Sequence, residues 1–365
     1  MIQNFGSSVP FWDQWGAEAA NLYLPWLNGN LTLNHLFHPH NEHRIFFSRI
    51  LSLLLLILNE RQWDPLLGMV VNAFISTCTA IFLIIILNNL LGKVVQNTII
   101  FVICLLWSLP YGWENIIASF QSAFYIMLLF TLILLWGLLL HDNFSFKWWL
   151  GAIFALLAIF TVASGFLILL VIIVLKLYLM IIDNRPTHLP TLLISIVITS
   201  ISIVLIVRIV NNEVLMANNI TEFMLAFGKA LAWPWIEYPF VSLILYLPFL
   251  TFVFRILWLR HKPSQAELFV LALGGWVILQ AASIAYARGA GGIMQASRYM
   301  DMLALGVIVN VLAFYFIAKH WHGLSHQIKL FLNIGICFWA LFVMLGMIGL
   351  TIMGSWPHIQ QRGLQ

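Results

Sequence analysis

The chain has 365 residues, of which 62% are hydrophobic and only 8% are charged, and its mean hydropathy is +0.98. A soluble domain has about 45–50% apolar and about 25% charged residues, so the composition excludes a water-soluble globule. The net charge of +4 is spread over the loops without a basic run, which gives no support for nucleic-acid binding.

Long apolar runs separated by short polar loops predict an all-α, polytopic transmembrane helical bundle, because the strands of a membrane barrel would alternate apolar and polar residues. Ahead of the spans, Phe46–Leu58 is apolar but too short to cross, which favours an interfacial or re-entrant helix. Ten spans are predicted at about Leu66–Leu91, Thr98–Leu109 (with borrowed flanks), Phe120–Leu140, Trp148–Ala163, Gly165–Ile182, Leu192–Val207, Val241–Trp258, Leu268–Tyr286, Met302–Ala318 and Leu330–Ile352.

The basic residues of the loops predict the orientation of the bundle. With residues 1–65 outside, Lys93, Lys147 and the Arg260–Lys262 cluster lie inside, as the positive-inside rule favours. Most acidic residues then lie outside. The predicted organisation is an exoplasmic loop over residues 1–65, a transmembrane domain over residues 66–353 and an exoplasmic tail over residues 354–365. Because residues 1–30 contain no signal peptide, we expect an initial helix to be missing ahead of them.

The stretch HPHNEHR concentrates titratable side chains in a chain with only 11 histidines. His38, His40, Glu42 and His43 carry groups that suit zinc or manganese, but the stretch lacks the His-Glu-x-x-His spacing of a helical metal site. If it begins a helix, His40, His43 and Arg44 share one face, which suits an anionic headgroup, a phosphate or a sugar. A divalent metal site, an anion or sugar site and a merely interfacial structure all stay open.

Asp13 is the first acidic residue of the chain and lies between Trp12 and Trp15. An aromatic setting suits the membrane interface and predicts a raised pKa for the carboxyl group of Asp13. The alternative is that the tryptophans anchor the loop and that Asp13 is solvated.

Two later segments, PYGWENIIASFQ and KALAWPWIEYPF, also fall on the outer side. Glu114, Asn115 and Gln121 of the first have carboxylate and amide groups that suit sugar hydroxyls, although they would equally form a polar helix cap. The second, residues 229–240, has the aromatic and proline content of a loop on the bilayer surface.

In the segment ARGAGGIMQASRYMD, Arg288 and Arg298 flank a glycine-rich turn, and Tyr299 and Asp301 enter the next helix. Exposed backbone amides beside two guanidinium groups predict a phosphate site, because arginine binds phosphate bidentately. Asp301 falls at membrane depth, where an unpaired charge is costly. We therefore expect it to pair with Arg298 or another buried cation.

The motifs HNEHR, WENIIASFQ, ASG (residues 163–165) and SRYMD, with a large first outer loop and a late Arg/Tyr-bearing loop, resemble uncharacterised bacterial members of the GT-C superfamily of polyprenyl-phosphate-dependent glycosyltransferases. The resemblance implies a GT-C-like bundle in the bacterial inner membrane. It also implies that a first-loop carboxylate, at the place of Asp13, activates the acceptor. GT-C enzymes usually begin with a helix ahead of this loop, and this sequence has none there.

The resulting expectation is a membrane glycosyltransferase that moves a sugar from a polyprenyl-phosphate-linked donor to a glycan, lipid or protein acceptor on the exoplasmic face. The catalytic candidates are Asp13 and Glu42. The substrate-binding candidates are His40, His43, Arg44, Glu114, Asn115, Gln121, Arg288, Arg298 and Tyr299. A transporter, another lipid-linked transferase or ligase, and a scaffold for envelope assembly are the alternatives. A transporter would place charges near the bilayer midplane, often within internal repeats, whereas the predicted midspan segments are nearly free of charge and no repeat is evident.

Overall fold

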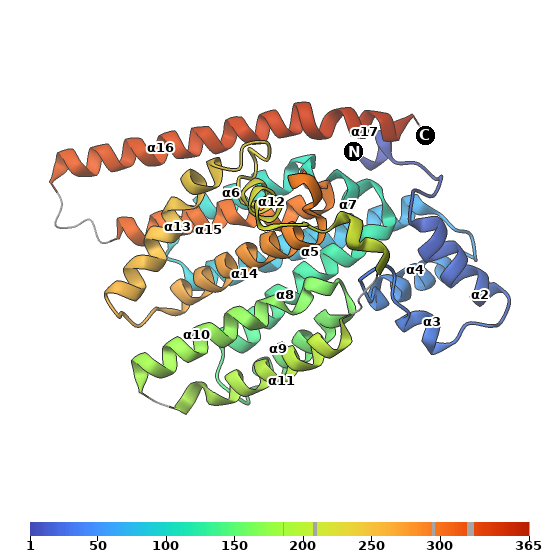
Figure 1. Cartoon of the computed structure of the whole chain (residues 1–365), viewed down its shortest axis with the longest axis horizontal. Helices are drawn as coiled ribbons and strands as arrows, with labels where there is room; N and C mark the ends of the chain where they lie inside the picture. Colours follow the sequence, from blue (N-terminus) through green and yellow to red (C-terminus); the bar gives the residue numbers. More distant parts are fainter. Residues whose placement is uncertain (185, 207–209, 294–295, 320–324, 365) are drawn as a thin grey trace.

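A computed structural model of the chain describes residues 1–184, 186–206, 210–293, 296–319 and 325–364. Every named element in these ranges is helical. Most of the long helices run side by side in one direction or its reverse, while the N-terminal segment gathers at one end of the bundle (Figure 1). The predicted all-α architecture is confirmed.

The N-terminal helices are α1 (Ile2–Phe5), α2 (Leu24–Leu27), α3 (Leu33–Phe37) and α4 (Phe46–Leu58), with a π-helical segment over Trp15–Tyr23. The bundle consists of α5 (Pro65–Leu90), α6 (Lys93–Ser108), α7 (Trp113–Ile117), α8 (Ser122–Leu140), α9 (Phe146–Leu157), α10 (Leu167–Asp183), α11 (Leu189–Leu205), α12 (Ile220–Leu231), α13 (Val241–Trp258), α14 (Gln265–Arg288), α15 (Met300–Ala318), α16 (His326–Gly349) and α17 (Trp356–Gly363). Short 3₁₀ turns precede α8, α10 and α15, and a π-helical turn joins α16 to α17.

Within the described ranges, nine helical stretches are long and apolar enough to cross a membrane, which is the architecture of an integral, multi-pass membrane protein. The remaining predicted span, Trp148–Ala163, corresponds to α9 with its 3₁₀ extension to Phe160 and falls short of that length. It nevertheless runs back along α8: it starts just after the C-terminal end of α8, and the amide of Ala163 beyond it donates to His43 Nδ1 at the other end. The chain therefore covers the bundle's length in this segment too.

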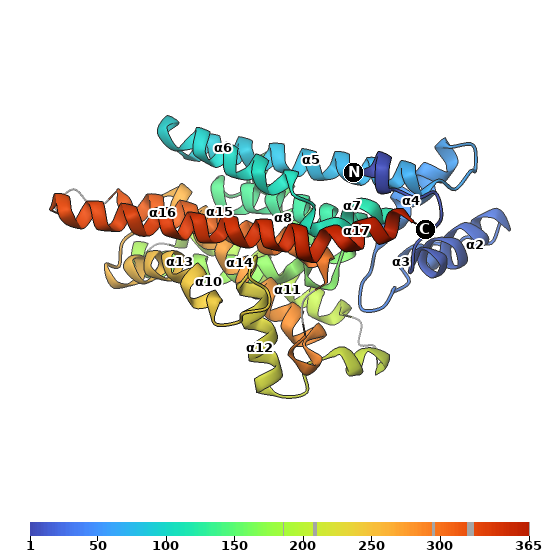
Figure 2. The same ribbon diagram turned by 90° about the horizontal axis from the view of Figure 1, so that it is seen from above.

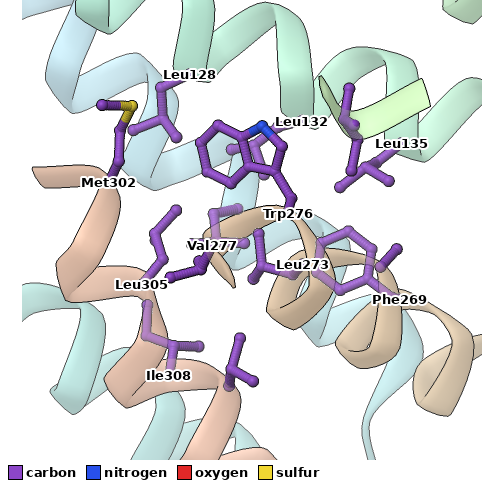
Figure 3. Close-up of a cluster of buried hydrophobic side chains, with 14 of the residues drawn as sticks. Leu128, Leu132, Leu135, Phe269, Leu273, Trp276, Val277, Met302, Leu305 and Ile308 are labelled. Atoms are coloured by element: carbon purple, nitrogen blue, oxygen red, sulfur yellow. The ribbon is translucent and has the colours of Figure 1, made fainter. Parts of the chain in front are cut away.

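The centre of the bundle is formed by α8, α14 and α15, which bury a larger share of their residues than the other long helices. Leu132 of α8, Trp276 of α14 and Leu305 of α15 point toward one another there (Figure 3). By contrast, α16 exposes an apolar surface along its length and lies at the rim of the bundle (Figure 1). A helix that is apolar on all sides and buried is a core element, whereas an exposed apolar face suits lipid.

The contact between α8 and α9 depends on two glycines. A Cβ atom on Gly137 would lie 2.5 Å from the carbonyl oxygen of Lys147 and 2.6 Å from Cα of Gly151, both of which are backbone atoms. Small residues at such crossings let helix backbones approach closely in membrane proteins.

We expect Gly137→Ala to lower the free energy of unfolding by about 1–3 kcal/mol, because the added methyl group forces the two backbones apart. Thermal unfolding of the detergent-purified protein measures the effect. Gly335→Ala on α16 is the matched control, since nothing lies within 4 Å of its added Cβ. Equal stability of both variants would contradict the close crossing.

Both chain ends lie at the end of the bundle where residues 1–65 gather (Figure 2). Arg362 Nη2 of α17 donates to the carbonyl oxygen of Val9 at 2.9 Å, and Gly363 contacts Phe5. The predicted tail, residues 354–365, is therefore largely helical.

The short helix predicted over Phe46–Leu58 has the bounds of α4. The Ser122 hydroxyl donates to Ser48 Oγ at 2.8 Å, and this hydrogen bond joins α4 to the start of α8.

The placement of this end outside the membrane is a prediction that cysteine labelling tests. In a variant without the three native cysteines, a membrane-impermeant thiol reagent on intact cells should modify Ser7→Cys and spare Ser264→Cys. Ser7 belongs to the N-terminal segment, and Ser264 is the N-cap of α14 at the far end. Labelling of the second position alone would invert the orientation.

Candidate functional site

The HPHNEHR stretch forms a tight turn and does not begin a helix, so the condition under which His40, His43 and Arg44 would share a helical face is not met. The backbones of His40 and His43 exchange two hydrogen bonds of 2.8 and 3.0 Å. Asn41 between them has φ +50°, a left-handed conformation that asparagine tolerates better than most residues. The turn directs His40 and His43 to the same cavity.

This cavity, here called the basic cavity, holds about 50 Å³ where the N-terminal segment meets α8, α14 and the turn before α15. Its walls combine two arginines, two histidines, one carboxylate and aromatic rings. They are lined by Asp13, His40, Asn41, His43, Ile45, Phe120, Gln121, Ala123, Phe124, Val162, Arg288, Arg298 and Tyr299. Residues from five distant parts of the sequence thus meet at one end of an apolar bundle.

Asp13 is the accessible carboxylate of the basic cavity, with 54% of its side chain exposed. His40 Nε2 lies 3.6 Å from Asp13 Oδ2. The expected rise in the pKa of Asp13 is wrong: His40, together with the charge of Arg298, lowers that pKa below its ordinary value against the opposing effect of burial. The hydrogen bond to His40 and the nearby positive charge outweigh burial, and Asp13 is ionised at neutral pH.

His43 is held as a neutral imidazole in the wall of the cavity. Burial lowers its pKa to about 4. The backbone amide of Ala163 donates to its Nδ1 at 3.1 Å, so the ring proton is on Nε2. Nε2 lies 3.7 Å from Glu42 Oε1. Residues 163–165, the ASG motif, therefore fix the tautomer of His43 through a backbone group.

Glu42 forms an ion pair with Arg288 at the edge of the cavity. Burial raises the pKa of Glu42, but hydrogen bonding and the charge of Arg288 outweigh this effect and leave the pKa below its ordinary value. Glu42 therefore orients Arg288 and faces His43, and it does not line the cavity itself.

Glu114 binds both the backbone and the guanidinium of Arg298. Its Oε2 accepts hydrogen bonds of 2.9 Å from the Ser297 hydroxyl and from the Arg298 backbone amide, and its Oε1 lies 3.3 Å from Arg298 Nη1. Below this pair, Asn115 Nδ2 donates to the Arg298 carbonyl oxygen at 2.9 Å and to Asp301 Oδ2 at 2.7 Å. The turn before α15 is thus fixed by α7.

The expected pairing of Asp301 with Arg298 is wrong. Arg298 points to Glu114 and the cavity, whereas Asp301 lies on the first turn of α15 and is held by Asn115. Asp301 also lies directly against Gly112, where a Cβ atom would come within 2.4 Å of its Oδ1. The side chains of Asn115 and Tyr125 bond this carboxyl group in place of a cation.

Arg44 is a predicted site residue whose side chain the structure turns away from the cavity. Its Nε donates to the Leu205 carbonyl oxygen and its Nη1 to that of Phe37, each at 3.2 Å. Arg44 therefore joins the N-terminal segment to the end of α11. Tyr299 packs edge-on against Phe124 and lies under the guanidinium of Arg298, while Gln121 lines the cavity.

The histidine-rich stretch does not assemble a metal centre in the part of the chain that the structure describes, where no three His, Cys, Asp or Glu side chains converge. His38 Nδ1 bonds the carbonyl oxygen of Pro39, and His35 bonds Thr32 at the start of α3. The arrangement favours the anion or sugar interpretation of the stretch.

A second polar network next to the cavity escaped the sequence analysis. Gln14 donates to Glu18 at 2.8 Å and to Ser119 at 2.7 Å, and Ser52 donates to Glu18 at 2.6 Å. Glu18 is buried, and burial raises its pKa. The spacing of Gln14 and Glu18 by four residues was the available signal. These bonds anchor the residues that follow Asp13.

The pH dependence of stability follows from His43. Between pH 6.5 and about 4, the unfolded chain binds a proton at His43 that the folded protein does not bind. Stability therefore falls as pH falls through this window, by about 3 kcal/mol at most from this group, and Glu42 acts in the same direction. We expect His43→Asn, which keeps an acceptor for the Ala163 amide, to flatten the dependence.

Thermal unfolding at several pH values measures this pH dependence of stability, with His141→Asn at the far end of the bundle as control. If His43→Asn and the wild-type protein lose stability equally on acidification, the pKa of His43 is not lowered by folding, and the prediction is wrong.

The chain matches no protein-family model, no curated protein and no solved structure.

Proposed function

We propose that the protein is a membrane glycosyltransferase that uses a polyprenyl-phosphate-linked sugar and acts on the exoplasmic face of a bacterial inner membrane. The observation that carries this proposal is the basic cavity itself. It joins an accessible carboxylate to two guanidinium groups and two imidazoles at the end of an apolar bundle. A lipid-linked sugar phosphate requires cations at the membrane surface and a base in water.

In the proposed reaction, Asp13 accepts the proton of the acceptor hydroxyl, and the hydroxyl oxygen attacks the anomeric carbon of the donor sugar. The bond between that carbon and the lipid-phosphate oxygen breaks, and its electron pair leaves on the phosphate. A base within hydrogen-bond reach and fixed donors for the developing charge supply the catalysis. The acceptor is a glycan, a lipid or a protein.

Arg288 and Arg298 are the proposed phosphate ligands. A guanidinium has five N–H donors in a planar fork, and the ion pairs with Glu42 and Glu114 engage only part of each fork. These carboxylates hold the forks in position before the substrate arrives, which reduces the ordering that binding requires. Gln121 of the cavity wall is suited to the hydroxyl groups of the donor sugar.

Mass spectrometry of lipids that co-purify with the protein tests the proposal. We expect a polyprenyl-phosphate sugar in the wild-type preparation and a depleted one in Arg298→Lys, which keeps the charge and loses the fork. Arg255→Lys, at the far end of α13, is the matched control. Absence of any polyprenyl phosphate from the wild-type preparation, or equal amounts in all three, would overturn the proposal.

A further inference from the structure

A second cavity of about 390 Å³ lies on the other side of the Glu114–Arg298 pair, between the N-terminal segment, α7 and α17. We call it the aromatic cavity. It is lined by Phe11, Trp12, Trp113, Glu114, Ala296, Ser297, Met300, Leu350, Gly354, Ser355, His358, Gln361 and Arg362. It lies at the end of the bundle where both termini lie (Figure 2).

Two chain segments form the partition between the aromatic and the basic cavity. In the N-terminal segment, Trp12 lines the aromatic cavity and the next residue, Asp13, lines the basic one. In the turn before α15, Ser297 lines the aromatic cavity and Arg298 the basic one. A molecule in the aromatic cavity therefore lies one residue away from the proposed base and from a proposed phosphate ligand.

The walls of the aromatic cavity present stacked rings together with polar groups. Phe11 and Trp12 stack at 4.5 Å, with the Arg362 guanidinium 4.6 Å from the Phe11 ring. Trp113 stacks on His358 at 5.7 Å with an interplanar angle of 13°. The Glu114 carboxylate and the Gln361 amide lie on the same walls.

Trp12 is held in a costly conformation at the rim of this cavity. Its φ is +47° and the residue is 62% exposed. A bulky residue with positive φ is an outlier, and an exposed indole leaves apolar surface in water that a bound partner would bury. Such strain persists where the surrounding structure enforces it and clusters at binding sites.

From these observations we infer that the aromatic cavity binds a saccharide, namely the acceptor of the proposed transfer, so this inference rests on the proposed function. A sugar ring has an apolar face of C–H groups and a rim of hydroxyls. The Trp12 and Trp113 rings are suited to packing against the C–H face. The side chains of Glu114, Gln361 and Ser355 are suited to hydrogen bonds with the hydroxyls. An acceptor hydroxyl that extends beyond Trp12 toward the basic cavity would lie next to the Asp13 carboxylate.

A glycan array tests the inference directly, with the detergent-purified, fluorescently labelled full chain as probe. The wild-type protein should bind one class of immobilised saccharide. Trp12→Ala should weaken this binding by about tenfold or more, the loss expected for one stacking aromatic ring, and His358→Ala should weaken it as well.

Trp15→Ala is the matched control, because Trp15 is similarly exposed on the same segment but packs against Trp63 and does not line the cavity. Binding that is lost in Trp12→Ala and kept in Trp15→Ala supports the inference. An array on which the wild-type protein binds no saccharide, or binding that Trp12→Ala leaves intact, overturns it.

The two proposals fail separately. If a polyprenyl-phosphate sugar co-purifies but no Trp12-dependent saccharide binding occurs, only the acceptor site is wrong. If saccharides bind through Trp12 and no polyprenyl phosphate co-purifies, the aromatic cavity is a saccharide site of a protein with another function.

Discussion

Asp13→Asn should lower the rate of sugar transfer by roughly 10²–10⁴-fold while donor binding stays almost unchanged. The substitution keeps the shape of the side chain and removes the proton acceptor. The lowered pKa of Asp13 means that the carboxylate is present throughout the neutral range, so we expect the wild-type rate to fall only at acidic pH. Turnover with the donor identified by mass spectrometry, and separately donor binding, measure the two effects.

Asp142→Asn is the control for this change, because Asp142 is exposed in the loop after α8 at the far end of the bundle. Glu42→Gln should cost less than Asp13→Asn, since Glu42 acts through Arg288 and His43. Full turnover of Asp13→Asn would move the base elsewhere. Glu42 would be the next candidate, because Glu18 is enclosed by Gln14 and Ser52.

Arg298→Ala should weaken donor binding by roughly 2–5 kcal/mol, because the guanidinium is largely buried and charge-paired. Arg288→Ala should act in the same direction. Lysine should rescue poorly at either position, since a point charge replaces a planar fork. Titration of the purified protein with the lipid-phosphate donor measures the loss, and Arg255→Ala controls for removal of an arginine elsewhere.

The Arg298→Ala variant leaves Glu114 buried without its cation, which threatens folding. The double variant Glu114→Gln, Arg298→Ala removes both charges and serves as the second test. Wild-type donor affinity in either folded variant would assign Arg298 to structure alone.

The spans were predictable because lipid imposes a simple rule: about twenty apolar residues are needed to cross a membrane. The bounds of α13 were predicted as they are found, while α9 is shorter than predicted because it passes into a 3₁₀ turn over Ala158–Phe160 and the backbone is extended at Val162. The α12 helix was missed, although Asn219 caps it by accepting from the Glu222 amide. An amphipathic helix of twelve residues gives no hydropathy signal of its own.

The candidate site was predictable as a set of residue types at one end of the bundle, and less so in its geometry. The helical alternative for HPHNEHR is not realised, because Asn41 adopts a left-handed conformation in a tight turn. The partner of Asp301 and the direction of Arg44 depend on Asn115 and on the Leu205 carbonyl, which are distant in sequence. Periodicity carries no information about such contacts.

Because neighbouring residues of one short segment line separate cavities, we expect occupancy of the two cavities to be thermodynamically linked. If a ligand that displaces Trp12 also displaces Asp13, the free energy by which one ligand changes the affinity of the other is the same in both directions. The donor should therefore bind with a different affinity in the presence of the acceptor, and reciprocally. Such linkage would let an enzyme at a lipid surface hold its activated sugar without losing it to water until the second substrate is in place.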